Sequence, residues 1–148
     1  MNTNLKIEID AINQPNFNSL VEAKTFIDFP DKCPLDGADP CNGDVYLICT
    51  DLSANDPGFK TAKENKKYKN VTDPMQICTK HGISVFSDLE SCKHQLEAFP
   101  GLGTKIATAK LTKDDGFIKR TFKTPLHHTW WPYKNENRHL SFTVVKEV

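Results

Sequence analysis

Hydrophobic and polar positions alternate strictly near the start of the chain and then take up helical spacing. Leucine and isoleucine occupy every second position over residues 5–9, which predicts a half-buried strand. Ser19 is followed three residues later by Glu22, the spacing of a capping box, and this predicts a short helix that ends before Pro30. An apolar run over residues 45–50 then predicts a second strand.

The chain becomes polar before a second set of elements begins. Residues 51–74 are rich in lysine and predict a solvated loop or an exposed short helix, with a binding surface as the alternative. Residues 81–86 predict a turn that leads into a short strand. A capping box over residues 87–90 and apolar residues at helical spacing over residues 89–99 predict a helix that Pro100 stops.

Three strands are expected in the C-terminal part of the chain. Residues 105–112 and 117–123 have the composition of strands, and the segment 113–116 between them predicts a hairpin loop. Alternation over residues 140–145 predicts the last strand. Without an internal repeat or a long linker, this order predicts one α+β domain over residues 1–148, with a mainly antiparallel sheet of about five strands and two or three helices.

Composition supports a globular chain with an uneven distribution of charge. The 148 residues are 38% hydrophobic, enough to fill one core, and 19 basic residues balance 19 acidic residues. Residues 1–58 nevertheless carry a net charge of −7, and residues 59–148 carry +7. The basic portion suggests an anionic partner, although the two portions could also fold over each other so that their charges cancel in space.

The sequence predicts where in the cell the protein is located. The N-terminal residues lack the basic and apolar regions of a signal peptide, and no apolar run approaches the roughly 18 residues that span a bilayer, so we expect a cytosolic protein with no membrane partner.

The chain has five cysteines and no Cys-x-x-Cys pair. We therefore expect them to be free and mostly buried. They are Cys33, Cys41, Cys49, Cys78 and Cys92.

The strongest chemical signal lies between Leu126 and Tyr133. This segment holds both tryptophans, and together with the nearby His139 it holds three of the five histidines. Imidazoles that titrate near neutral pH, aromatic rings and fixed positive charges are the groups that nucleotide and RNA sites use. The candidate catalytic residues are His127, His128 and His139. The candidate ligand-binding residues here are Lys123, Thr129, Trp130, Trp131, Tyr133, Lys134 and Arg138.

A second candidate site lies at the start of the strand expected near residue 83. His81 precedes Gly82, which permits a ligand to approach the backbone closely, and Ser84 could hydrogen-bond a ribose or an amide. The structural alternative is a turn glycine before a core strand.

These residues leave three functions open. The first is a module that binds an anionic ligand, either a nucleotide or single-stranded RNA, through the basic and aromatic C-terminal segment. The second is a metal-independent enzyme acting on phosphodiesters or nucleotides, with His127 and His128 as the acid–base pair and His139 or Arg138 stabilising charge. The third is a protein-interaction module with an exposed tryptophan pair, whose partner is another protein or a second copy.

The segment from Leu126 to Tyr133 could instead have a purely structural role, in which the tryptophans anchor an edge of the core and the histidines form hydrogen bonds with backbone carbonyls. A metal would require three or four ligands to meet at one point, as His127, His128 and His139 could, but no spacing indicates this, so we assign no metal ligand. The sequence leaves the cofactor unknown. The motifs Gly-x-Ser-x-Gly and His-Glu-x-x-His are absent from the sequence.

Overall fold

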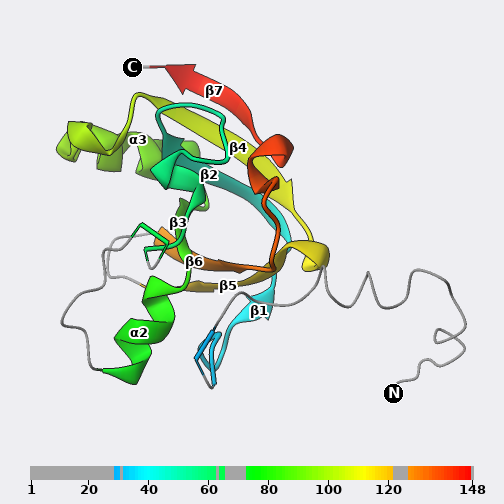
Figure 1. Cartoon of the computed structure of the whole chain (residues 1–148). Coiled ribbons are helices and arrows are strands. Elements are labelled where there is room, and N and C mark those ends of the chain that lie inside the picture. The colour runs from blue at the N-terminus through cyan, green and yellow to red at the C-terminus, as the bar shows by residue number, and fades with distance from the viewer. Residues whose placement is uncertain (1–28, 31, 63, 66–72, 122–126, 148) are drawn as a thin grey trace, which may run out of the picture.

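The fold is a curved antiparallel sheet with helices on its outer side, as seen in a computed structural model (Figure 1). The structure describes residues 29–30, 32–62, 64–65, 73–121 and 127–147. The strand expected at residues 5–9 and the helix expected from Ser19 lie outside the described residues. The strands are β1 (Asp39–Pro40), β2 (Gly43–Cys49), β3 (Ile83–Phe86), β4 (Lys105–Leu111), β5 (Gly116–Arg120), β6 (His127–Pro132) and β7 (Thr143–Glu147). The α-helices are α2 (Pro74–Lys80) and α3 (Leu89–Ala98), and the 3-10 helices are η2 (Pro57–Phe59), η3 (Pro100–Leu102), η4 (Lys113–Asp115) and η5 (Arg138–Ser141).

The seven strands are ordered β1-β5-β6-β3-β2-β4-β7, and every neighbouring pair is antiparallel. The sheet curls strongly, since the ring of Trp130 in β6 lies 6.1 Å from that of Phe142, which directly precedes the edge strand β7. This curvature encloses the main core on the concave side. That core includes Leu47, Val85 and Leu111, which are buried together with Trp130 and Phe142.

The convex side of the sheet carries a second, smaller core beneath α3. Its buried members are Phe86, Cys92, Leu96 and Ile106. Asp88 caps α3, because its carboxylate accepts a hydrogen bond from the backbone N–H of Ser91 at 2.7 Å. The helix therefore starts at the predicted position and packs against β2 and β3. Its cap differs from the predicted capping box over residues 87–90, because Asp88 rather than Ser87 is the capping residue.

The fold class is confirmed as α+β with a mainly antiparallel sheet, but several local predictions are wrong. The sheet has seven strands among the described residues, rather than about five. No hairpin joins β4 to β5: they belong to opposite halves of the sheet, and β5 pairs with β6 and β1 instead. Residues 138–141 form η5, which leaves Leu140 exposed and delays the last strand until Thr143.

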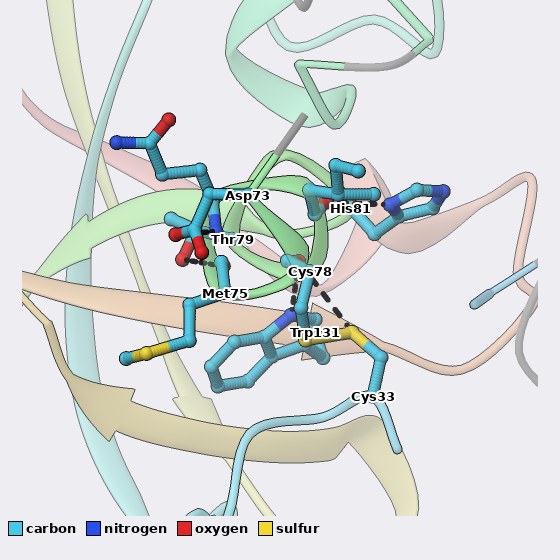
Figure 2. Close-up of a disulfide and its surroundings, with 9 residues drawn as sticks. Cys33, Asp73, Met75, Cys78, Thr79, His81 and Trp131 are labelled. Carbon is cyan, nitrogen blue, oxygen red and sulfur yellow. Dashed lines mark hydrogen bonds between the residues drawn. A yellow bond between two sulfur atoms is a disulfide. The ribbon is translucent and has the colours of Figure 1, made fainter. Parts of the chain in front are cut away.

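The prediction of free cysteines is wrong for Cys33 and Cys78, which form a disulfide (Figure 2). They are 45 residues apart in sequence, and the fold brings their Cα atoms to 5.5 Å, within the range that a disulfide requires. Cys41, Cys49 and Cys92 are free and buried, as predicted.

No helix in the described ranges combines the length and the apolar character needed to cross a membrane.

Candidate functional site

The candidate site is a cleft that opens where β2 and β3 part. These two strands share the register pair Tyr46 and Phe86, whereas β3 pairs with β6 over its whole length. Continuing that register would place Ile48 opposite Ser84, but both residues instead line a cleft of about 420 Å³. We call it the β2–β3 cleft. Its polar lining comes from Thr50, Lys60, Asn65, Thr79, Lys80, Ser84, Gln95, His127 and Thr129.

One wall of the cleft is the convex face of β3 and β6. Residues directly opposite each other in an antiparallel pair share a face, so Ser84 and Thr129 lie together, as do Phe86 and His127. The hydroxyl groups of Thr129 and Thr121 lie 2.7 Å apart and form a hydrogen bond. Three residues predicted from two separate segments, namely Ser84, His127 and Thr129, are therefore brought into one cleft.

Gly82 permits this wall to close up against α2. A Cβ atom at this position would collide with the Cγ2 atom of Thr129 and would lie 3.1 Å from the backbone oxygen of Trp130. The glycine therefore serves close packing between the end of α2 and β6.

His127 is a neutral imidazole at physiological pH. Its side chain is buried and packs edge-on against Phe86, with ring centroids 5.1 Å apart. Burial, and secondarily the charge of the neighbouring His128, lowers the pKa of His127 from 6.5 to about 4. The ring can take part in hydrogen bonds, but it does not supply an imidazolium near pH 7.

The charged groups that line the cleft are cations. Lys60 follows η2 and Lys80 ends α2, and no described Asp or Glu lines the cleft. Asp56, which directly precedes the lining residue Pro57, is buried and accepts hydrogen bonds from the backbone N–H groups of Thr50, Asp51 and Gly58 at 2.9 to 3.0 Å. Its carboxylate therefore holds the turn that carries Lys60, because backbone donors satisfy its oxygens.

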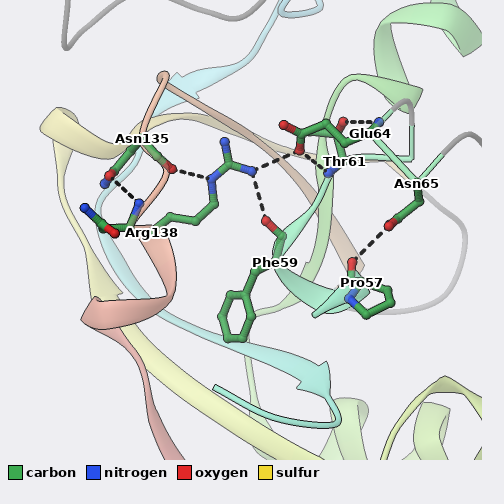
Figure 3. A network of polar contacts seen from close by, with 8 residues as sticks. Pro57, Phe59, Thr61, Glu64, Asn65, Asn135 and Arg138 are labelled. Atoms are coloured by element: carbon green, nitrogen blue, oxygen red, sulfur yellow. Dashed lines mark hydrogen bonds and ion pairs between the residues drawn. The ribbon is translucent and has the colours of Figure 1, made fainter. Parts of the chain in front are cut away.

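Arg138 also fixes the loop that carries Lys60, through contacts with Phe59 and Glu64 (Figure 3). Its Nη1 donates to the backbone oxygen of Phe59 at 2.9 Å and forms an ion pair with Glu64 at 3.2 Å. Its Nε donates to the backbone oxygen of Asn135 at 3.2 Å, and its side chain is buried. Arg138 was predicted to contact phosphate. Its side chain instead binds Phe59 and Glu64 and so positions the loop that carries Lys60 beside the cleft.

The tryptophans are not an exposed stacking surface, which corrects that expectation. Trp130 is 2% exposed and Trp131 is 0% exposed. They point to opposite faces of β6 and both faces are covered, Trp130 by the main core and Trp131 by α2. Each indole N–H donates a hydrogen bond to a backbone oxygen. Trp130 donates to the backbone oxygen of Asp115 at 2.9 Å, and Trp131 donates to that of Cys78 at 2.8 Å.

The remaining predicted residues lie away from the cleft. His128 projects to the concave face and lines a separate cavity of about 130 Å³, so it does not meet His127. Tyr133 and Lys134 line a third pocket, of about 480 Å³, beside Trp130 and Arg138.

His81 and His139 have structural positions. Nδ1 of His81 lies 2.9 Å from the backbone oxygen of Ile77 at the end of α2. The ring of His139 lies edge-on to Phe59, with centroids 6.2 Å apart. Lys123 lies outside the described residues.

Metal binding and thiol catalysis gain no support from the part of the chain that the structure describes. No three His, Cys, Asp or Glu side chains there come together as a metal site would require. Burial raises the pKa of Cys41 and Cys92 to about 12 and that of Cys49 to about 11, so all three remain protonated and unreactive near pH 7.

Lys60, Lys80 and Gln95 were not singled out as site residues from the sequence. The lysine-rich composition of residues 51–74 was a signal for Lys60, but it favoured a solvated loop. Lys80 had no signal, since α2 has only seven residues and shows too few turns for a periodic pattern.

Comparisons with protein-family models, with curated proteins and with solved structures find no match to this chain. Its function is therefore argued from its own residues.

Proposed function

We propose that the protein binds a small anionic ligand of the nucleotide class in the β2–β3 cleft. The observation that carries this proposal is that Lys60 and Lys80 line one cleft together with several hydroxyl groups and His127, with no carboxylate among its described lining residues. Ammonium groups favour phosphate oxygens, and hydroxyl and imidazole groups can hydrogen-bond a ribose or a base. The positive net charge of residues 59–148 favours the same class of ligand.

The dimensions of the cleft favour a single nucleotide over a strand of RNA. Its volume of about 420 Å³ falls within the range typical of small-molecule sites. Single-stranded RNA is usually bound by exposed aromatic rings on which successive bases stack, and both tryptophans are buried.

The proposal is binding rather than catalysis. An acid–base pair must act on one substrate, but His127 and His128 line different cavities on opposite faces of β6. The protein-interaction hypothesis depended on exposed tryptophans and loses that support.

Isothermal titration calorimetry at low ionic strength tests the proposal, with ADP and pyrophosphate as the probes. We expect both to bind, and we expect Lys80→Gln to weaken ADP binding about ten-fold, because a charge-assisted hydrogen bond is worth about 1.5 kcal/mol or more. Lys110→Gln is the matched control, since Lys110 is exposed on β4 opposite Asp44 and does not line the cleft.

Absence of binding by both probes would contradict the proposal. Equal weakening by Lys80→Gln and Lys110→Gln would also contradict it, because that result would indicate attraction by net charge rather than a site.

A further inference from the structure

The disulfide joins an early segment of the chain to the helix that ends at the cleft. Cys33 lies in the segment before β1, and Cys78 lies in the last turn of α2 (Figure 2). The ring of Phe29, from the same early segment, lies edge-on to that of His81, with centroids 5.4 Å apart. Two contacts thus hold this segment against the C-terminal end of α2.

The position of α2 depends strongly on Cys78. A helix of seven residues has little stability of its own and relies on tertiary contacts. Cys78 is the buried residue of α2, and its backbone oxygen accepts the hydrogen bond from the indole N–H of Trp131. The disulfide therefore acts on the residue that fixes α2 to the sheet.

The two residues that follow Cys78 belong to the cleft. Thr79 and Lys80 line it, and Gly82 continues its wall into β3. A shift of the end of α2 would therefore move Lys80, the cation that the ligand is proposed to contact.

We propose that the Cys33–Cys78 disulfide controls ligand binding in the β2–β3 cleft. This inference rests on the proposed function. The oxidised chain holds α2 in the binding position, and reduction lets its end move and weakens binding. A dithiol reductant supplies the two electrons and two protons. One thiolate of the reductant attacks the sulfur of Cys33, the more exposed of the two cysteines, and Cys78 leaves as a thiolate that takes up one proton. The second thiolate of the reductant then attacks the mixed disulfide, which closes the reductant's own disulfide and releases Cys33 as a thiolate that takes up the other proton.

The first experiment counts free thiols, to test whether the Cys33–Cys78 disulfide forms. The oxidised, denatured protein should show three thiols and the reduced protein five. Five thiols in protein that was purified without reductant would overturn the inference.

Calorimetry with ADP then compares the oxidised protein, the protein reduced by dithiothreitol, and Cys33→Ser/Cys78→Ser with and without dithiothreitol. We expect reduction to weaken binding at least ten-fold while circular dichroism shows a folded chain. We expect the double variant to bind as weakly as the reduced protein and to be insensitive to the reductant.

Equal affinity in the oxidised and reduced proteins would overturn the inference and leave the proposed function intact. Loss of binding through global unfolding would also overturn it, because control at α2 requires the rest of the chain to stay folded. Absence of ADP binding in every form would refute the proposed function, and the inference with it.

Discussion

Acid should destabilise the fold through His127. The folded chain holds this ring with a pKa of about 4, against 6.5 for an ordinary histidine, because the ring is buried. Between about pH 4 and pH 6.5, the unfolded chain therefore binds a proton at His127 that the folded chain does not bind. The stabilising contribution is fully present above about pH 6.5, falls as the pH drops from 6.5 to 4, and changes little below that.

The magnitude follows from the two pKa values. A difference of one between pKa values corresponds to about 1.4 kcal/mol, so the full effect is about 3 kcal/mol, of which about 2 kcal/mol is lost by pH 5. That is a substantial part of the roughly 5 to 15 kcal/mol that stabilises a typical domain.

Urea unfolding at pH 7 and pH 5 measures the effect. Carboxylates also titrate in this range, so the wild-type chain is compared with His127→Gln, which keeps every carboxylate. We expect the wild type to lose about 2 kcal/mol more than His127→Gln between the two pH values. His94→Gln is the control, because His94 is exposed on α3 and its replacement should leave the pH dependence unchanged. Equal losses in the wild type and His127→Gln would refute the reasoning.

Three further changes test other parts of the account by denaturant unfolding. Replacing the disulfide in Cys33→Ser/Cys78→Ser should cost about 2 to 4 kcal/mol, because it frees a loop of 45 residues in the unfolded chain, and an unchanged midpoint would contradict the pairing. Arg138→Met should cost about 2 to 3 kcal/mol, since it removes a partly buried ion pair and two hydrogen bonds to backbone oxygens; a cost below about 0.5 kcal/mol would mean that the guanidinium is solvated. Gly116→Ala should cost about 2 kcal/mol or more, because its φ of +121° is strained for alanine and its Cβ would collide with the backbone of β6, whereas Gly101→Ala, with no atom within 4 Å of its Cβ, should cost far less.

Local patterns predicted several elements of the fold. The helical spacing of apolar residues predicted α3, an apolar run predicted β2, and residues typical of strands predicted β4. β6 shows no such pattern, because five of its six residues are buried and both of its faces are covered. The sequence therefore showed its aromatic and histidine content but not its position inside the sheet.

Long-range pairing could not be predicted from local composition. The segment 113–116 has the residues of a hairpin turn, yet β5 continues to the far half of the sheet and pairs with β6. The Cys33–Cys78 pair is equally non-local.

The structure places the predicted site residues in different parts of the fold. Ser84, His127 and Thr129 were chosen for their chemistry and lie in one cleft, because β3 and β6 are neighbours. His128 was chosen by the same argument, but alternation along a strand sends it to the opposite face.

The most direct test of the central claim is an amide NMR titration of the oxidised, ¹⁵N-labelled chain with ADP. The account predicts that the largest shift changes fall on amides that line the β2–β3 cleft, among them Gly58, Gly82 and Ser84, and that Lys80→Gln reduces them. Shift changes concentrated on Tyr133 and Lys134 would place the ligand in the other pocket and contradict the account, as would the absence of any change.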